Sequence, residues 1–223
     1  GVVVYTVKTY QMSDATAALG ALRPDAVFSV ANGVMKNEQL RAVYGAAPVL
    51  GCMANVSGEL LASGEVSFTR NVRLPLGALP GYSGPAPAAI AEVINAAGIV
   101  AEAVSDIETV EWSKFVGWLA MFTLAVIARS STGVYLENPR LAAVGVKIVK
   151  EAAAVAAARG IRLVDQSPLP VVSVATAPDD ASAAAFLRDI GRNLIAQAPT
   201  HRMSALQDLE AGRKLEEIGR ASC

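Results

Sequence analysis

The polar residues with the clearest chemical potential lie near the C-terminus, in the run THRMSALQDLEAGRKLEE of residues 200–217. This run places Ser204, Asp208, Arg213 and Glu216 among apolar neighbours. On a helix, spacings of four, five and eight keep several of these side chains near a common face. The run therefore indicates either a solvated helix surface or a site for a small polar substrate.

Lys114 is the second candidate, because it directly precedes the most apolar stretch of the chain, residues 115–128. A lysine at this edge can extend its charged end to solvent. Alternatively, it can act as a general acid, because a positioned lysine ammonium can give a proton to a reacting group. His201 is the only histidine, so a lysine is a serious candidate for that proton donor.

Lys8 and Asn32 each follow a predicted buried strand. In open sheets of parallel strands, ligands bind in the crevice outside the carboxyl ends of the strands. Both side chains are therefore candidates for a ligand site at that edge. Asn32-Gly33 is also a common turn dipeptide, which is the alternative explanation for it.

Metal and nucleophile chemistry have little support. His201 stands without the neighbouring ligands that a zinc site needs, and no Ser-His-Asp arrangement can be argued from the spacing. The two cysteines, Cys52 and Cys223, do not form a disulfide framework. A reducing cytoplasm fits this usage.

The first part of the chain alternates strands with helices. Continuous apolar runs predict buried strands, and runs with helical spacing predict helices, with Ser13 as the N-cap of the first. In order, the segments are strand Val2–Val7, helix Ser13–Leu22, strand Ala26–Ala31, helix Asn37–Tyr44 and strand Pro48–Met53. This alternation predicts a parallel, doubly wound sheet.

A hairpin and a further helix and strand complete this part. The turn dipeptide Ser63-Gly64 separates two short β-like stretches, Glu59–Ala62 and Glu65–Thr69. After a loop, a helix is expected over Ala88–Ala97 and a last strand over Ile99–Val104.

From Asp106 onward the pattern is helical, apart from an irregular connection marked by prolines 168, 170 and 178. The expected helices are Thr109–Ala128, one starting at Asn138-Pro139 and running to Arg159, Ser182–Ala196, and Pro199 to about Gly219. We therefore expect two domains, an α/β part over residues 1–105 and an all-α part over residues 106–223.

Charge and hydropathy exclude some classes of partner. The 223 residues include 19 basic and 20 acidic ones, giving a net charge of -1, and no basic stripe is present. Nucleic acid is therefore not expected as a partner. The apolar run Phe115–Ala128 falls short of the roughly 18–20 residues that span a bilayer, so a buried core helix is expected and no membrane partner.

Four motifs in order resemble the ketopantoate reductase (2-dehydropantoate 2-reductase) family over nearly the whole chain. Family members carry a strand ending in VK, then NG, then a W-x-K helix, then S-M-x-Q-D followed by R-x-x-E. The matching residues here are Val7-Lys8, Asn32-Gly33, Trp112 to Lys114, and, as the fourth motif, Ser204 to Asp208 followed by Arg213 to Glu216. Each motif is weak alone, and their common order makes the signal strong.

The resemblance implies a fold, a reaction and roles for these residues. It implies the remainder of a Rossmann-type sheet followed by an all-α domain, and NADPH-dependent reduction of 2-dehydropantoate to pantoate, a precursor of pantothenate and coenzyme A. Lys114 would be the catalytic lysine, with Glu216 orienting the substrate through a hydroxyl group. Ser204 would contact the substrate, and the Lys8 and Asn32 positions would belong to the cofactor and the active-site cleft.

The family opens with a strand and a glycine-rich GxGxxG turn, which this sequence does not contain. We therefore expect the chain to be a fragment that lacks the N-terminal phosphate-binding unit. The preference for NADPH over NADH is read in that part of such a domain, so these residues do not decide it.

Two positions depart from the family pattern. Asparagines one and two turns after the catalytic lysine usually face the substrate, and here these positions hold Trp118 and Phe122. The alternatives are therefore a reductase of a more apolar 2-oxo acid, or a non-catalytic homologue that serves as an assembly module. The expected partner is a small 2-oxo acid, the expected location is the cytoplasm, and a homodimer is possible.

Overall fold

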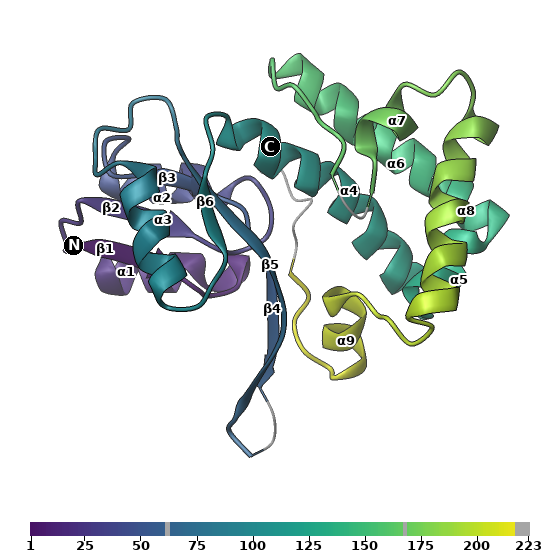
Figure 1. Ribbon diagram of the computed structural model, residues 1–223, viewed down its shortest axis with the longest axis horizontal. Helices are drawn as coiled ribbons and strands as arrows, with labels where there is room; N and C mark the ends of the chain where they lie inside the picture. Colours follow the sequence, from purple (N-terminus) through teal and green to yellow (C-terminus); the bar gives the residue numbers. More distant parts are fainter. Residues whose placement is uncertain (61–62, 167–168, 217–223) are drawn as a thin grey trace. The chain divides into compact units, whose positions relative to one another are not determined.

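The computed structural model describes residues 1–60, 63–166 and 169–216. The chain divides into two compact units, of which the first contains residues 1–111 and the second begins at Trp112. The first unit combines strands and helices, and the second is helical (Figure 1). The division of the sequence after residue 105 stays a prediction.

The elements of the first unit alternate as expected in its N-terminal half. They are β1 (Val2–Tyr5), the 3-10 helix η1 (Thr9–Gln11), α1 (Met12–Leu19), β2 (Ala26–Ser29), α2 (Lys36–Tyr44), β3 (Leu50–Cys52), β4 (Asn55–Leu60), β5 (Val66–Ala78), α3 (Pro87–Ala96) and β6 (Ala101–Ala103). Strands β1 and β2 are parallel, and a parallel bridge between Val27 and Val49 links β2 to the segment before β3. The predicted α/β class with parallel strands is confirmed.

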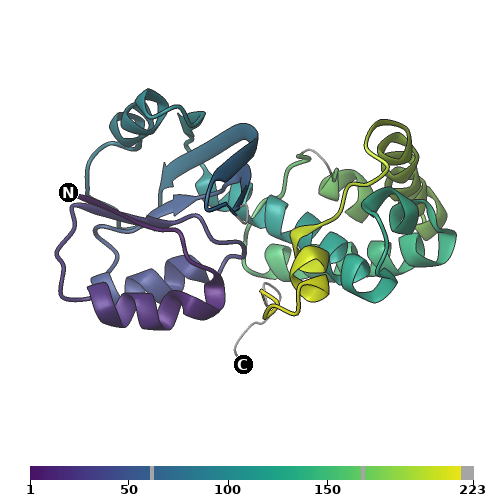
Figure 2. The same cartoon turned by 90° about the horizontal axis from the view of Figure 1, so that it is seen from below.

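Strand β2 is buried along its whole length because helices cover both of its faces. Ala26 and Phe28 belong to one apolar cluster together with Ile90 of α3. Val27 points to the other cluster, which includes Met12 of α1 and Leu40 of α2. Figure 2 shows α1 and α2 on one side of the strands and α3 on the other.

A second, four-stranded sheet is built on β5, which pairs with three strands. It is antiparallel to β4 and β3 and parallel to β6. The expected hairpin is present, with Gly64 at a φ of 87° in the turn region, a conformation that glycine adopts without steric cost. However, the second strand continues to Ala78, well beyond the expected end at Thr69.

The second unit consists of helices around one apolar core. They are α4 (Ile107–Ala128), whose first turn lies in the first unit, α5 (Thr132–Glu137), α6 (Pro139–Ala158), α7 (Val171–Ala175), α8 (Asp180–Gln197) and α9 (Ser204–Glu210). The predicted start of α6 is confirmed, because the Asn138 side chain accepts the backbone N–H groups of Arg140 and Leu141 at 3.0 and 3.2 Å.

Helices α5 and α8 pack very closely through two glycines. A Cβ atom on Gly191 would lie 2.5 Å from the backbone nitrogen of Glu137, and one on Gly133 would lie 2.9 Å from the carbonyl oxygen of Gly191. No side chain fits at these distances, so the crossing depends on glycine at both positions.

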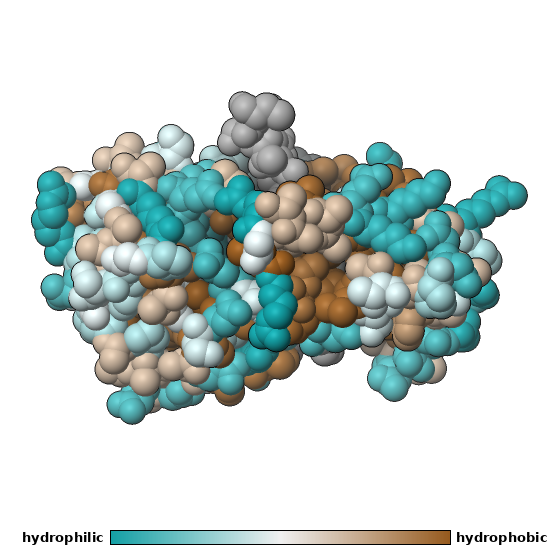
Figure 3. Space-filling view, turned by 90° about the horizontal axis from the view of Figure 1, so that it is seen from above, coloured by the Kyte–Doolittle hydropathy of each residue, from teal (hydrophilic) through white to brown (hydrophobic). Residues whose placement is uncertain are grey.

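Helix α4 is the central core element of the second unit. Val116, Ala120, Met121, Leu124 and Ala125 are buried in the apolar cluster that also holds residues of α5, α6 and α8. Among the described residues it is the one helix long and apolar enough to cross a membrane, and half of its most apolar window is buried inside the protein. A core helix of a globular domain shows the same combination of length and hydropathy. Figure 3 shows one face of the molecule, and hydrophilic side chains cover much of it.

Three expected features are wrong. The N-cap of α1 is Gln11, and Ser13 lies inside the helix. Helix α7 forms within the segment that the prolines marked as irregular. The long helix expected from Pro199 to about Gly219 is replaced by the short α9, because the chain turns at Gly212 with a φ of 65°. The end of that expected helix, and Cys223, lie outside the described residues.

Candidate active site

Lys8 and Asn32 lie at the same edge of the first unit's sheet. Tyr5 and Ser29 are partners in the parallel register of β1 and β2, and Lys8 and Asn32 each follow their partner by three residues. The Val30 N–H donates to the Tyr5 carbonyl at 3.1 Å and extends this pairing beyond the strand end. Both candidate side chains are half-buried. The structure thus brings them to the carboxyl edge, where ligands of such sheets bind.

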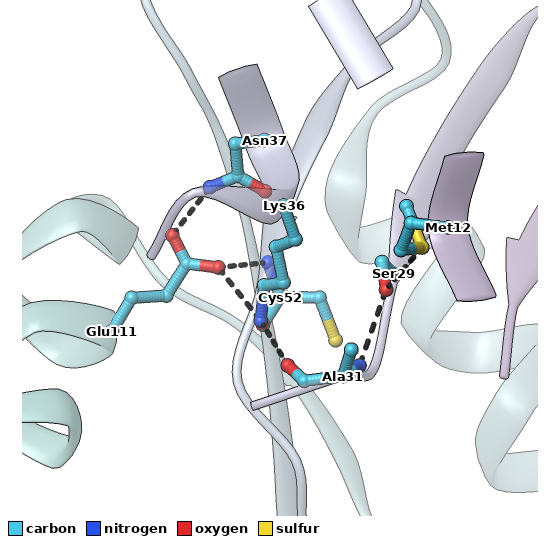
Figure 4. Close-up of polar contacts among 7 residues, drawn as sticks. All are labelled: Met12, Ser29, Ala31, Lys36, Asn37, Cys52 and Glu111. Carbon is cyan, nitrogen blue, oxygen red and sulfur yellow. Dashed lines mark hydrogen bonds and ion pairs between the residues drawn. The ribbon is translucent and has the colours of Figure 1, made fainter. Parts of the chain in front are cut away.

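A buried polar cluster lies at the end of β2 and includes the backbone of Ala31, the residue before Asn32 (Figure 4). Lys36, at the start of α2, donates from Nζ to the carbonyl oxygens of Ala31 at 2.9 Å and Cys52 at 2.5 Å. Its Nζ also lies 3.3 Å from Oε1 of Glu111. Lys36 therefore joins the ends of β2 and β3 from inside the protein.

Glu111 completes this cluster from the second turn of α4. Its Oε1 accepts the Cys52 backbone N–H at 3.0 Å, and its Oε2 accepts Nδ2 of Asn37 at 2.7 Å. The Glu111 and Lys36 side chains are each only 3% exposed. Burial raises the pKa of the Glu111 carboxyl, and the Lys36 ammonium and the two N–H donors oppose that rise.

The cluster fixes the backbone on which Asn32 stands. Lys36 donates to the Ala31 carbonyl oxygen, and the Ala31 N–H donates to the Ser29 hydroxyl at 3.2 Å. Both polar backbone groups of Ala31, the residue before Asn32, are therefore hydrogen-bonded. Sequence reasoning missed this role of Lys36 and Glu111. They lie 75 residues apart in the chain, and their residue types are those of ordinary surface positions.

Lys114 lies in the second unit, on α4, next to an aromatic ring. Its Nζ lies 5.2 Å from the ring centroid of Trp118, one helical turn further along. Both side chains are half-buried, so Lys114 does not simply extend into solvent. The geometry is that of a cation–π contact.

The two aromatic departures from the family pattern occupy different environments. Phe122 is 6% exposed and belongs to the apolar core of the second unit. Trp118 only borders that core. Phe122 is therefore a packing residue, and Trp118 alone of the two has a ring beside Lys114.

The C-terminal candidates do not share one helix face. Ser204 is the first residue of α9 and is exposed, whereas Glu216 is largely buried six residues after the helix ends. The Arg213 Nε donates to Asp208 Oδ1 at 2.8 Å, so Arg213 forms an ion pair with a carboxylate of the same polar run. The roles of Ser204 and Glu216 stay predictions.

The single histidine has a structural contact. The Nδ1 atom of His201 lies 3.0 Å from the Thr132 hydroxyl, and the Thr132 N–H donates to the His201 carbonyl at 2.8 Å. These bonds join the start of α5 to the segment before α9. Within the described ranges, no three His, Cys, Asp or Glu side chains form a group that could hold a metal ion.

Comparison with known proteins matches both units to one family. Residues 1–81 match the family described as "Ketopantoate reductase PanE/ApbA", and residues 106–217 match "Ketopantoate reductase PanE/ApbA C terminal". A 2-dehydropantoate 2-reductase of Archaeoglobus fulgidus is 29% identical over 211 residues, covering 95% of this chain. The chain spans 64% of the length of that relative.

Solved structures share the fold. A PanE/ApbA family ketopantoate reductase from Ralstonia eutropha aligns with a TM-score of 0.73 at 24% identity, covering 96% of this chain and 64% of the other. A D-mandelate dehydrogenase in complex with NADH aligns with a TM-score of 0.77 at 18% identity, covering 97% and 67%. These likenesses confirm a Rossmann-type sheet followed by a helical domain.

Proposed function

Because this chain belongs to the ketopantoate reductase family, we propose that its full-length protein is an oxidoreductase that reduces 2-dehydropantoate to pantoate. The observation that carries this proposal is the match of both units, in order, to the two parts of that family. The cofactor we propose is NADPH, which supplies a hydride to the C2 carbonyl carbon when bound.

The first unit offers a fitting place for the nicotinamide cofactor. Lys8 and Asn32 stand at the carboxyl ends of two parallel strands, the edge used by dinucleotides in such sheets. Lys36 binds the carbonyl oxygen of Ala31, the residue before Asn32, and this contact supports the preorganisation that a binding edge needs. In our proposal Lys8 and Asn32 bind the cofactor, and Asn32 also contacts the substrate.

The second unit supplies the proton and the substrate contacts. Lys114 donates a proton from Nζ to the C2 oxygen as negative charge develops there. Glu216 accepts a hydrogen bond from a substrate hydroxyl and orients the acid, and Ser204 adds a further polar contact. The half-buried position of Lys114 supports this role, because a proton donor must be shielded from bulk water to act selectively.

A second candidate function keeps the reaction and changes the substrate. Trp118 lies beside Lys114 where an amide is usual in the family, and an indole ring cannot satisfy the hydroxyl groups of a polar acid as an amide does. An unpaired polar group in an apolar site costs about 1–3 kcal/mol. Trp118 therefore favours 2-oxo acids with apolar side chains, whereas Phe122 exerts no such preference because it is core.

The test compares two substrates and two cofactors in the full-length protein. We expect kcat/KM for 2-dehydropantoate with NADPH to exceed the value for 2-oxoisovalerate, and NADPH to be preferred over NADH. A clear preference for 2-oxoisovalerate would establish the second candidate. No turnover with either acid and either cofactor would contradict the proposal and leave a non-catalytic homologue. The cytoplasmic location stays a prediction. The homodimer also stays a prediction, and light scattering of the same preparation measures the oligomeric state.

A further inference from the structure

We propose that Trp118 is a positioning residue that holds the ammonium group of Lys114 over its indole ring for proton donation. This inference rests on the proposed function, since it concerns the proton donor of that reaction. It adds a role that the family pattern, with an amide at this position, does not contain.

The geometry of α4 brings the two side chains together. Lys114 and Trp118 are four residues apart, and side chains at this spacing are neighbours on one helix face. Long helical side chains lean toward the N-terminus, so the Trp118 ring leans toward Lys114. The distance of 5.2 Å from Nζ to the ring centroid is within the range of about 6 Å for an attractive cation–π contact.

The ring stands on a rigid part of the helix. The neighbouring Gly117 packs so closely on Leu169 and Val171 that a Cβ atom there would lie 3.3 Å from each. On the other side of Lys114, the buried Ser113 hydroxyl accepts the Val164 N–H at 2.9 Å. Trp118 itself packs against the core cluster. The helix is thus fixed on both sides of the lysine.

The fixed ring of Trp118 limits the positions that the Lys114 ammonium can take. A lysine side chain carries about 2 kcal/mol of rotamer entropy, and part of that freedom has to be lost before Nζ can reach the transferring proton. The indole face attracts the ammonium, which is the proton-bearing form, and narrows its range of positions before substrate binds. A proton donor held in this way acts from a near-attack position.

The competing explanation is that Trp118 only fills space on the helix surface. Packing depends on the shape of the ring, whereas cation–π attraction depends on the negative charge at its face. Fluorine atoms on the indole withdraw that charge with little change in shape. Fluorination therefore separates the two explanations.

The experiment uses the full-length protein with Trp112→Phe, so that Trp118 is the only tryptophan of this chain. The ring of Trp112 contacts Phe115 and Arg159, and phenylalanine keeps an aromatic ring at this position. Biosynthetic incorporation of mono-, di- and trifluorotryptophan then weakens the ring face stepwise. We expect kcat to fall with each fluorine, by about 3- to 30-fold in total, with KM little changed.

Two further measurements complete the test. Trp118→Phe and Trp118→Tyr retain an aromatic face and should rescue most of the kcat that Trp118→Leu loses. In protein with 13C-labelled lysine, one Cε methylene signal should show an aromatic ring-current shift that disappears in both Trp118→Leu and Lys114→Arg.

The outcomes separate this inference from the proposed function. An active enzyme whose kcat is insensitive to fluorination, or a protein without the ring-current shift, would overturn the role of Trp118. Absence of reductase activity in the protein with its natural Trp118 would instead overturn the proposed function, and with it the catalytic part of the inference.

Discussion

Two lysines, the buried Lys36 in the first unit and the half-buried Lys114 in the second, show opposite uses of the same side chain. Lys36 in the first unit is enclosed by oxygen atoms, namely the carbonyls of Ala31 and Cys52 and the carboxylate of Glu111. Lys114 in the second unit lies beside the face of Trp118. Three oxygen acceptors occupy the N–H donors of the Lys36 ammonium, whereas an aromatic face attracts an ammonium group without accepting a conventional hydrogen bond from it.

The comparison teaches that the surroundings of a lysine indicate its role better than its burial does. Lys36 is the more buried of the two lysines. Its N–H donors are bound by backbone and carboxylate oxygens, so its role is structural (Figure 4). Its removal should therefore affect folding first. Removal of Lys114 should affect chemistry first.

Lys114→Ala is the change with the largest expected effect. In the full-length enzyme we expect kcat with 2-dehydropantoate to fall by about 10²–10⁴-fold, because general acid catalysis is typically worth that much, with little change in the affinity for NADPH. Steady-state NADPH oxidation and a fluorescence titration measure the two quantities. Lys147→Ala, which removes an exposed lysine on α6, is the matched control and should retain activity. Near-normal turnover in Lys114→Ala would remove this lysine from the mechanism.

Lys36→Met should destabilise the first unit by about 3–5 kcal/mol, because it leaves the Glu111 carboxyl buried without its cation. Native-state hydrogen exchange of the amides in β2 and β3 measures this loss in the full-length protein. The double variant Lys36→Met with Glu111→Leu, which removes both charges at similar volume, should recover much of the stability. Equal losses in the single and double variants would show that the pair is not energetically coupled.

The same variant has a predictable dependence on pH. Without Lys36, burial raises the pKa of Glu111 with less opposition. A carboxyl with a raised pKa in the folded state contributes stability at low pH that is lost as pH rises through that pKa. The deficit of Lys36→Met relative to the natural protein should therefore be smaller at pH 5 than at pH 8. Glu111→Gln added to this variant should abolish the difference.

Asn138→Ala has the smallest expected effect. It shows whether a modest loss of stability in the second unit changes kcat. It removes the side chain that caps α6 and should lower the stability of this unit by about 1 kcal/mol, without changing kcat at 25 °C. Thermal unfolding followed by circular dichroism measures the first effect, and Asn138→Asp should retain the cap. If kcat fell together with stability, a loss of turnover in Lys114→Ala would no longer identify a chemical role.

Local signals predicted the elements well where one residue type decides the conformation. Asn138-Pro139 marked the start of α6, and the order of strands and helices in the first unit followed from apolar periodicity. The expected C-terminal helix does not extend past Glu210, because the chain turns at Gly212, and glycine commonly terminates helices in this left-handed conformation.

The candidate site was predictable only in part, for a physical reason. The equal offsets of Lys8 and Asn32 follow from parallel pairing, and strand ends are visible in the sequence. The contact of Lys36 with Glu111 depends on tertiary folding between positions 75 residues apart, for which no local pattern exists. Phe122 is buried in the core and Trp118 only borders it, because of how α4 is rotated about its own axis. The sequence does not predict this rotation, since the helix is apolar on nearly every side.

The single long strand β5 has a consequence for the order of folding. Only five residues separate it from β4, so their hairpin closes at low entropic cost. Its pairings with β3 and β6 join residues 28 and 27 positions apart, such as Leu50 with Ala78 and Leu74 with Ala101. Local contacts form faster than distant ones. The hairpin is thus expected to order first and to act as the template on which β3 and β6 assemble during synthesis of the chain.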